Sequence, residues 1–119
     1  MSRADMERRR DEVAAEIDTL QESLLSLFEA SRSSNADDEH DPEGSTIGYE
    51  RAQLTAVRDA ARRRLADLDD ALRRLDDGTY GICEVCGRPI PGARLEARPS
   101  ARTCVGCAGR QGRAGSGAP

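Results

Sequence analysis

Four cysteines in two CxxC pairs constrain the fold of this chain more than any other feature of its sequence. Cys83 and Cys86 form the first pair, Cys104 and Cys107 form the second, and 17 residues separate the pairs. The short spacing lets the chain bend back so that both sulfurs of a pair face one ion, and Gly87 directly after the first pair favours that turn. Two such pairs are typical of a tetrahedral zinc site. The sequence therefore predicts one Zn²⁺ ion, which is structural because four thiolates leave no coordination position open.

Two disulfides, or a redox-active CxxC, are the alternative interpretations of these cysteines. The first residues, MSRADMERRRDEV, are charged throughout and lack the apolar core of a secretory signal. No apolar run approaches the roughly 20 residues of a membrane span. We therefore expect a cytoplasmic protein, in which thiols stay reduced and zinc is favoured. Because Ile82, Ile90 and Leu95 are too few to form a core, metal binding should supply most of the folding free energy of this segment.

Two long stretches carry the heptad spacing of a coiled coil. They run from about Arg3 to Ser33 and from about Thr46 to Asp77, with apolar residues mostly at alternating steps of three and four. Gly78 is expected to cap the end of the second helix. The predicted seam consists of Met6, Val13, Ile17, Leu20, Leu24 and Leu27 in the first stretch, and of Ile47, Leu54, Val57, Ala61, Leu65, Leu68, Leu72 and Leu75 in the second.

The turn-forming residues SSNADDEHDPEGS separate these two stretches, so the helices are expected to fold back on each other. Antiparallel pairing gives a consistent register in which the numbers of facing residues sum to about 81. In that register Leu27 faces Leu54 and Ile17 faces Leu65. The acidic residues between the stretches then lie at the end of a helical hairpin.

Together these patterns predict an all-α chain in three parts. Residues 1–78 form an antiparallel coiled-coil hairpin with an acidic tip at 35–45, residues 79–108 form a small four-cysteine zinc finger, and the Gly-rich residues 109–119 form a disordered tail. An aromatic content of 3% argues against a thick core. The sequence has no nucleophile–base pair and no phosphate-binding loop, so we do not expect an independent enzyme.

The acidic run DDEHDPE at residues 37–43 is a candidate functional site. A charge run in a turn is usually a solvated loop, and that is the alternative here. The position at the end of a hairpin favours a functional role instead, in which carboxylates are presented to a partner. Asp38, Asp41 and Glu43 are the candidate residues of this tip.

Charge is spread unevenly along the chain. Residues 1–78 carry a net charge of −8 and residues 79–119 carry +4, which together give the overall −4. The acidic first part argues against a protein that wraps duplex DNA, because the phosphates would repel it. The basic second part could serve solubility or the docking of a partner. The candidate docking residues are Arg88, Arg94, Arg98 and Arg102.

A helical hairpin with an acidic tip, followed by a four-cysteine zinc module, resembles the DksA/TraR family of bacterial transcription regulators. The most specific part of the resemblance is GTYGICEVCGRPIPGARLEARPSARTCVGC, which is similar to the family's zinc finger along its whole length. The resemblance implies a protein that binds bacterial RNA polymerase. Its coiled-coil tip would enter the secondary channel and modulate initiation, without reading a DNA sequence and often together with ppGpp.

Two features of this chain depart from the family's pattern. The family's tip motif is commonly Asp-x-x-Asp-x-Ala, and here Asp38 and Asp41 match both aspartates while Glu43 stands at the alanine position. Larger members continue into a helix after the last cysteine pair, whereas this chain continues into Gly-rich sequence. The tip and the end of the zinc finger are therefore the places where this chain should differ from its relatives.

Two other functions fit parts of the sequence. A zinc ribbon could bind nucleic acid, or act as an adaptor, through its arginines, with the hairpin as a dimerisation device. The small basic excess and the lack of adjacent aromatic residues argue against base stacking. Gre-type factors are similar in outline and are thought to help polymerase hold a metal for transcript cleavage, a role that the tip carboxylates would allow. Polymerase binding that depends on the tip would favour the transcription regulator, whereas salt-dependent binding of DNA or RNA would favour the zinc ribbon.

Overall fold

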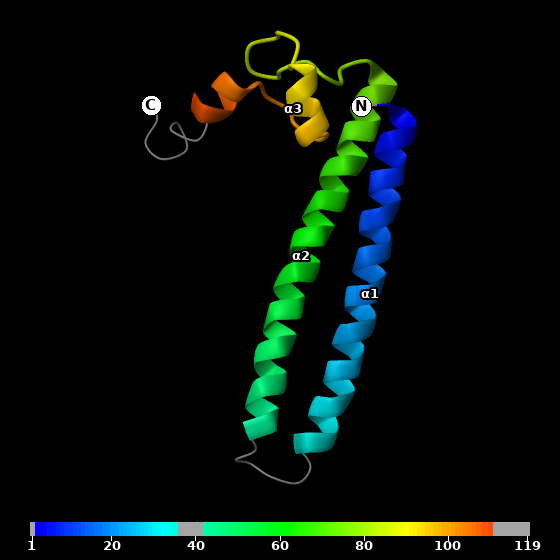
Figure 1. Ribbon diagram of the computed structural model, residues 1–119, viewed down its shortest axis with the longest axis vertical. Helices are drawn as coiled ribbons and strands as arrows, with labels where there is room; N and C mark the ends of the chain where they lie inside the picture. The colour runs from blue at the N-terminus through cyan, green and yellow to red at the C-terminus, as the bar shows by residue number, and fades with distance from the viewer. Residues whose placement is uncertain (1, 36–41, 111–119) are drawn as a thin grey trace. The chain divides into compact units, whose positions relative to one another are not determined.

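The computed structural model describes residues 2–35 and 42–110, with side chains over 2–32 and 46–110. Its three named helices are α1 (Arg3–Asn35), α2 (Pro42–Asp77) and α3 (Gly92–Ala97) (Figure 1). Residues 105–110 are also helical, and the one pairing of extended backbone in the described residues is an isolated bridge between Ile82 and Pro89. This architecture confirms the predicted all-α fold class. None of the described helices carries an apolar stretch long enough to cross a membrane.

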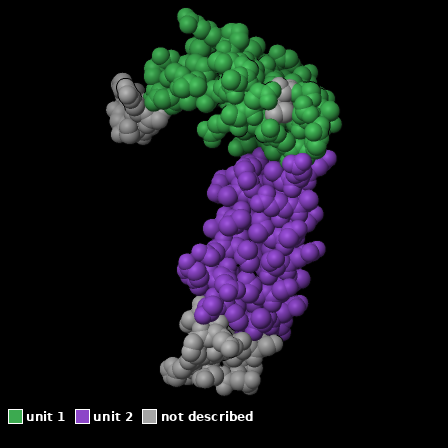
Figure 2. All heavy atoms as spheres, in the orientation of Figure 1, with its two compact units in different colours: residues 1–9, 67–119 green, residues 10–66 purple. Residues whose placement is uncertain are grey.

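The chain divides into two compact units (Figure 2). Unit 2 consists of residues 10–66, and unit 1 consists of residues 1–9 together with 67–119. Within unit 2, α1 and α2 run antiparallel and side by side (Figure 1). Unit 1 contains the cysteines, α3 and the last turns of α2.

A thin apolar seam holds the two helices of unit 2 together. Ile17 and Ala61 are buried, whereas most of the other predicted seam positions in this unit are half-buried. Val57 departs from the prediction, because its side chain is 47% exposed. Each helix of a two-helix hairpin is covered on one side only, so a residue at the margin of the seam remains in contact with water. An ion pair of 3.0 Å joins Arg64 to Glu16, and their numbers sum to 80, close to the predicted register.

Helix α2 begins earlier than the heptad pattern predicted. We expected a start near Thr46, but the helix begins at Pro42. Proline suits the first helical position, because its fixed φ is helical and its missing N–H would have no partner within the helix. Glu43 therefore lies in the first turn of α2 and not in the turn between the helices. Asp38 and Asp41 lie outside the described residues.

Helix α2 ends at a glycine cap, as predicted. Gly78 has a φ of 80°, which places it in the left-handed region. The backbone N–H of Thr79 donates to the carbonyl of Arg74 at 2.9 Å, the bond that characterises a left-handed helix cap. The cap ends the helix and directs the chain into the first cysteine pair.

Candidate metal centre

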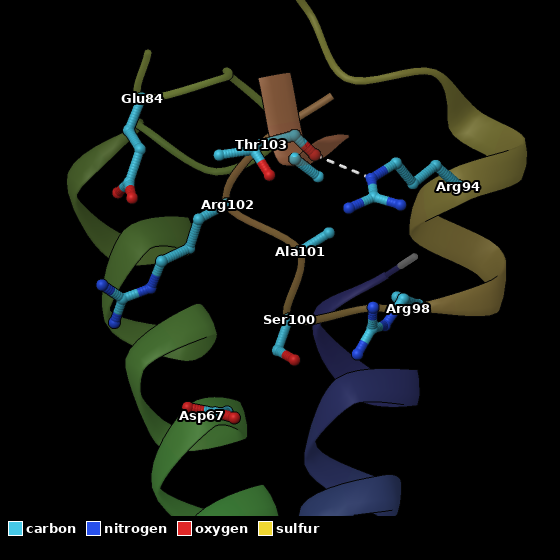
Figure 3. Close-up of a pocket in the computed structure, with 9 residues that line it drawn as sticks. Asp67, Glu84, Arg94, Arg98, Ser100, Ala101, Arg102 and Thr103 are labelled. Atoms are coloured by element: carbon cyan, nitrogen blue, oxygen red, sulfur yellow. Dashed lines mark hydrogen bonds between the residues drawn. The ribbon is translucent and has the colours of Figure 1, made fainter. Parts of the chain in front are cut away.

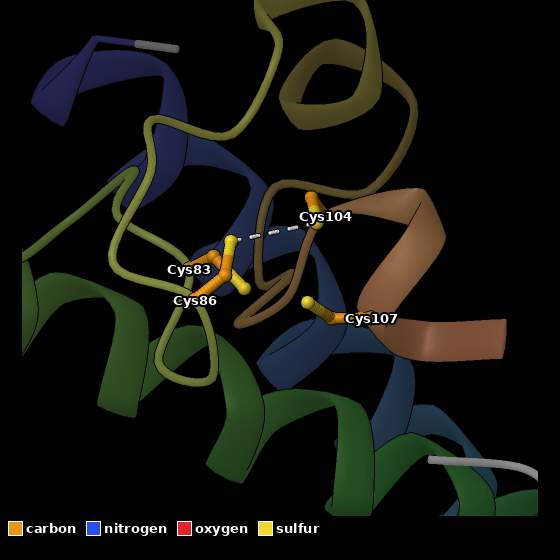
Figure 4. A group of neighbouring side chains, drawn as sticks. All are labelled: Cys83, Cys86, Cys104 and Cys107. Carbon is orange, nitrogen blue, oxygen red and sulfur yellow. Dashed lines mark hydrogen bonds between the residues drawn. The ribbon is translucent and has the colours of Figure 1, made fainter. Parts of the chain in front are cut away.

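The four cysteine sulfurs converge at one point of unit 1 (Figure 4). All four Sγ atoms lie within 4.8 Å of one another, and those of Cys86 and Cys104 are 3.9 Å apart. Four sulfurs at the usual zinc–sulfur distance form a tetrahedron with an edge of about 3.8 Å. None of the four is in a disulfide. The donor set and its spacing therefore fit a tetrahedral Zn²⁺ ion better than two disulfides.

Short backbone hydrogen bonds shape the first cysteine pair. Gly87 has a φ of 75°, and its N–H donates to the carbonyl of Cys83 at 2.9 Å. This positive φ confirms the predicted need for glycine directly after the first pair. The N–H of Cys83 in turn donates to the carbonyl of Arg88 at 2.8 Å. The chain therefore reverses direction within a few residues, which lets both sulfurs face one point.

The second cysteine pair lies at the start of the helical residues 105–110. The N–H of Ala108 donates to the carbonyl of Cys104 at 2.9 Å. A further bond of 2.9 Å, from the N–H of Glu84 to the carbonyl of Arg102, joins the two cysteine segments directly. Because the segments are tied by backbone bonds, their sulfurs are positioned without a large apolar core.

The surroundings of the sulfurs affect their protonation unequally. A hydrogen bond from the backbone of Cys86 is the main cause that lowers the pKa of Cys83, to about 6. A backbone hydrogen bond from Cys107 likewise lowers the pKa of Cys104. Burial instead raises the pKa of Cys107 to about 12. The surroundings therefore favour the thiolate at Cys83 and the neutral thiol at Cys107, and Cys107 has to lose its proton when a metal binds.

A very small core surrounds the sulfurs. Ile90 and Leu95 are buried together with Cys83 and Cys107, whereas Ile82 is 45% exposed. So little buried apolar area cannot by itself hold the segment in one fold. The centre therefore fits one structural zinc ion, and we expect the metal to supply most of the folding free energy of this segment. Partly buried side chains that pack against this core are those of Tyr80, Ala101 and Cys104.

A cluster of charged residues joins the zinc finger to the last turns of α2. Asp70 accepts hydrogen bonds from Arg74 at 3.0 Å and from Arg73 at 3.1 Å, and it forms an ion pair of 2.7 Å with Arg102. We call these four residues the Asp70 cluster. Burial alone would raise the pKa of Asp70, but hydrogen bonds from Arg73 and Arg74 and the charges of Arg102 and Arg74 lower it overall. The carboxylate is therefore stabilised in its charged form.

Arg74 extends the Asp70 cluster to the backbone that precedes the second cysteine pair. Its guanidinium donates to the carbonyls of Ser100 and Ala101, at 3.2 and 3.3 Å. It also lies 5.9 Å from the ring centroid of Tyr80, whose hydroxyl donates to the carbonyl of Pro99 at 2.8 Å. Arg74 thus contacts the carboxylate of Asp70, the ring of Tyr80 and the backbone segment that leads to Cys104.

Three of the four predicted docking arginines line one cavity of about 320 Å³ in unit 1 (Figure 3). Two of them have other partners, since Arg94 donates to the carbonyl of Thr103 at 2.7 Å and Arg102 pairs with Asp70. Arg98 is exposed. Two acidic residues, Asp67 and Glu84, also line the cavity. Its lining is therefore of mixed charge, and half of the predicted docking arginines stabilise the finger itself.

Sequence reasoning missed three residues of this centre: Asp70, Arg74 and Arg110. The guanidinium of Arg110 donates to Cys107 Sγ at 3.0 Å. Arg110 had been assigned to the tail, but the helical residues 105–110 extend past the predicted end of the finger at 108. Its spacing of three residues from Cys107 was the available signal. The spacing of Asp70 from Arg73 and Arg74 was a local signal for ion pairs on one helix face. Their contacts with the finger left no local pattern, because Arg102, Ser100 and Ala101 lie far along the chain.

Comparison with known families gives a match over residues 78–111 to the prokaryotic dksA/traR C4-type zinc finger. The RNA polymerase-binding transcription factor DksA of Caulobacter vibrioides is 50% identical over 56 residues, which are 47% of this chain and 39% of that protein. General stress protein 16O of Bacillus subtilis is 40% identical over 72 residues, which are 60% of this chain and 44% of that protein. The matches thus span less than half the length of these relatives.

A solved structure extends the likeness beyond the finger. The structure of transcription factor DksA2 from Pseudomonas aeruginosa aligns with a TM-score of 0.58 and 26% identity, covering 92% of this chain and 84% of that one. By its zinc finger, its relatives and its fold, the chain has the features of the DksA/TraR family, which confirms the resemblance drawn from the sequence.

Proposed function

We propose that this chain is a cytoplasmic RNA polymerase-binding transcription regulator. The match of its finger to the dksA/traR type carries the proposal, together with similar proteins that are named RNA polymerase-binding transcription factors. The antiparallel helices of unit 2 support it, since they can present the residues between α1 and α2 at one end of a narrow support. The chain would act through binding and not through catalysis of its own.

The acidic residues between the helices are the part that we propose enters the secondary channel of the polymerase. Asp38 and Asp41 lie in that stretch of the sequence, and Glu43 follows in the first turn of α2. Negative charge at the start of a helix is favourable, because it complements the helix dipole. Carboxylates brought close to magnesium ions and basic side chains bias how those groups are arranged. The effect on initiation would arise in this way, without contact to a specific DNA sequence.

The resemblance to the DksA/TraR family also implies ppGpp as a small-molecule partner. The guanidinium groups of Arg94, Arg98 and Arg102, which line the cavity, are those that we propose could face the phosphates of ppGpp. Two of these groups already have partners, and Asp67 and Glu84 add negative charge to the same lining. We therefore expect the chain alone to bind ppGpp weakly. The same engagement of Arg94 and Arg102 weakens the alternative of a nucleic-acid-binding zinc ribbon.

Competition on bacterial RNA polymerase tests the proposed binding site. Labelled protein is titrated onto the polymerase, with and without an excess of a known secondary-channel binder. Displacement by the competitor is the expected result. Binding without displacement would contradict insertion into the channel, and absence of binding, with a salt-dependent shift of DNA or RNA instead, would favour the nucleic-acid alternative.

Asp41→Asn tests the tip itself. We expect this variant to keep its zinc and its polymerase binding but to lose roughly fivefold or more of its effect on initiation in vitro, at the lower end of typical coupling between sites. Asp18→Asn is the matched control, because Asp18 is an exposed carboxylate of α1 outside the acidic run. Wild-type activity of Asp41→Asn, or an equal loss in Asp18→Asn, would contradict a specific role for the tip.

A further inference from the structure

Arg110 is the residue on which this inference rests. Its Nη2 atom lies 3.0 Å from Cys107 Sγ, and Cys107 is completely buried. The helical residues 105–110 explain this contact, because positions three apart lie on the same face of a helix. Long helical side chains also point back toward the preceding turn. The guanidinium is therefore directed at the sulfur by the local fold.

The charge of the metal centre gives this contact a physical role. Zn²⁺ with four thiolates carries a formal charge of −2, and buried charge is costly unless it is paired or hydrogen-bonded. Backbone N–H groups already donate to the sulfurs of Cys83 and Cys104. Those donors are neutral, whereas a guanidinium is positively charged at every physiological pH. A hydrogen bond from it is charge-assisted and so stronger than a neutral one.

We infer that Arg110 supports the zinc site from outside the coordination sphere. Through its hydrogen bond to Cys107 it compensates thiolate charge and holds that ligand in place, and so it strengthens zinc binding. Groups that orient metal ligands in this way contribute about 10–100-fold to metal affinity in other sites. The inference concerns the zinc centre alone and does not depend on polymerase binding.

Other arginines of the finger provide the comparison that the test needs. The side chains of Arg94 and Arg102 are directed to the carbonyl of Thr103 and to Asp70. Arg88 lies two residues after Cys86, and its side chain is exposed. Replacing Arg88 removes one positive charge from the finger without removing a hydrogen bond to sulfur. Arg88→Ala is therefore the matched control for Arg110→Ala.

The first measurement is zinc affinity of the full chain, determined by competition with a chelator at pH 7. We expect Arg110→Ala to bind zinc about tenfold more weakly, at the lower end of the range because Arg110 is itself exposed. Arg110→Lys should recover part of that loss, since it keeps the charge but not the planar donor group. Arg88→Ala should stay within about twofold of the wild type, as expected for an exposed charge.

Cobalt substitution distinguishes a bond to sulfur from a general structural effect. Removing a hydrogen bond from a thiolate raises the energy of its lone pairs, so the sulfur-to-cobalt charge-transfer band should move to lower energy in Arg110→Ala and stay unchanged in Arg88→Ala. Wild-type zinc affinity and an unshifted band in Arg110→Ala would overturn the inference. Equal losses in Arg110→Ala and Arg88→Ala would also overturn it. Should Arg110→Ala fail to fold, the band position in Arg110→Lys decides.

Discussion

In unit 2 the helices are held by a seam in which burial is spread over many half-buried side chains, and Ile17 and Ala61 are its buried members. In unit 1 the finger depends on four sulfurs that lie within 4.8 Å of one another and on one carboxylate that forms ion pairs with three arginines. When burial is distributed along a seam, each substitution lowers the stability in proportion to the buried apolar groups that it removes. A metal centre loses its fold when a single component is absent. The two units should therefore respond differently to the same kind of damage.

Removal of zinc should give the largest difference in stability between the two units. Apparent zinc-binding energies in small fingers are about 10–16 kcal/mol, which exceeds what Ile90 and Leu95 can supply by burial. We expect a chelator to unfold the finger while α1 and α2 keep most of their helix. Far-ultraviolet circular dichroism measures the helix content, and thiol alkylation measures exposure of the cysteines. Complete loss of the helix signal would show that the hairpin also depends on the metal.

A substitution in the seam should have a smaller effect, confined to the hairpin. Ile17→Ala is expected to cost about 2–3 kcal/mol of unfolding free energy, because Ile17 is buried in a seam with few other enclosed side chains. The control is Val57→Ala, which should cost well under about 1 kcal/mol because Val57 is 47% exposed. Urea unfolding followed by circular dichroism gives both values. A fall in zinc affinity caused by Ile17→Ala would contradict the independence of the two units.

The Asp70 cluster should give the smallest of the three effects. Asp70→Asn is expected to destabilise the zinc-loaded finger by about 1–2 kcal/mol, toward the lower end for hydrogen bonds to a charged group because the Asp70 side chain is partly exposed. Asp67→Asn is the control, because Asp67 is an exposed carboxylate of the same helix. Urea unfolding with saturating zinc, followed by tyrosine fluorescence, compares the two variants. An equal loss in both would show that the cluster adds nothing specific.

The pH dependence of the Asp70 variant follows from the sign of its pKa shift. The pKa of Asp70 is lowered in the folded state, so its stabilisation is complete above the ordinary aspartate pKa and is lost as the pH falls through the lowered value. The difference between wild type and Asp70→Asn should therefore stay constant from about pH 8 to 5. A difference that shrinks within this window would contradict the assigned charge state.

Much of the architecture could be predicted because it is recorded in local patterns. The heptad spacing predicted α1 and α2, the cysteine spacing predicted the metal, and Gly78 and Gly87 have the positive φ values that their turns require. Each of these features has a signature with short internal spacing: heptad steps of three and four, two residues between the cysteines of a pair, and a single glycine at each turn. A helix boundary such as Pro42 is less certain, since proline suits both a turn and a first helical turn.

Two kinds of feature could not be predicted: contacts between residues far apart in the sequence, and how far each seam side chain is buried by its neighbours. Asp70 and Arg102 are 32 positions apart, and no periodic pattern links them. Ala71 is completely buried although it lies outside the predicted seam, whereas Val57 within the seam is half-exposed. Burial at such positions is decided by which neighbour covers them. The heptad pattern predicts which face of a helix packs against its partner, but not how completely each side chain on that face is buried.

The two tyrosines give this chain a built-in pair of optical reporters. Tyr49 lies in unit 2 and is 66% exposed, whereas Tyr80 lies in unit 1, packs against the zinc-finger core and donates its hydroxyl to Pro99. The sequence contains no tryptophan that would mask their emission. Burial raises the pKa of Tyr80, so its phenol should ionise at higher pH than a free tyrosine. With Tyr49→Phe, ultraviolet absorbance and emission report the state of the finger alone, without any attached dye.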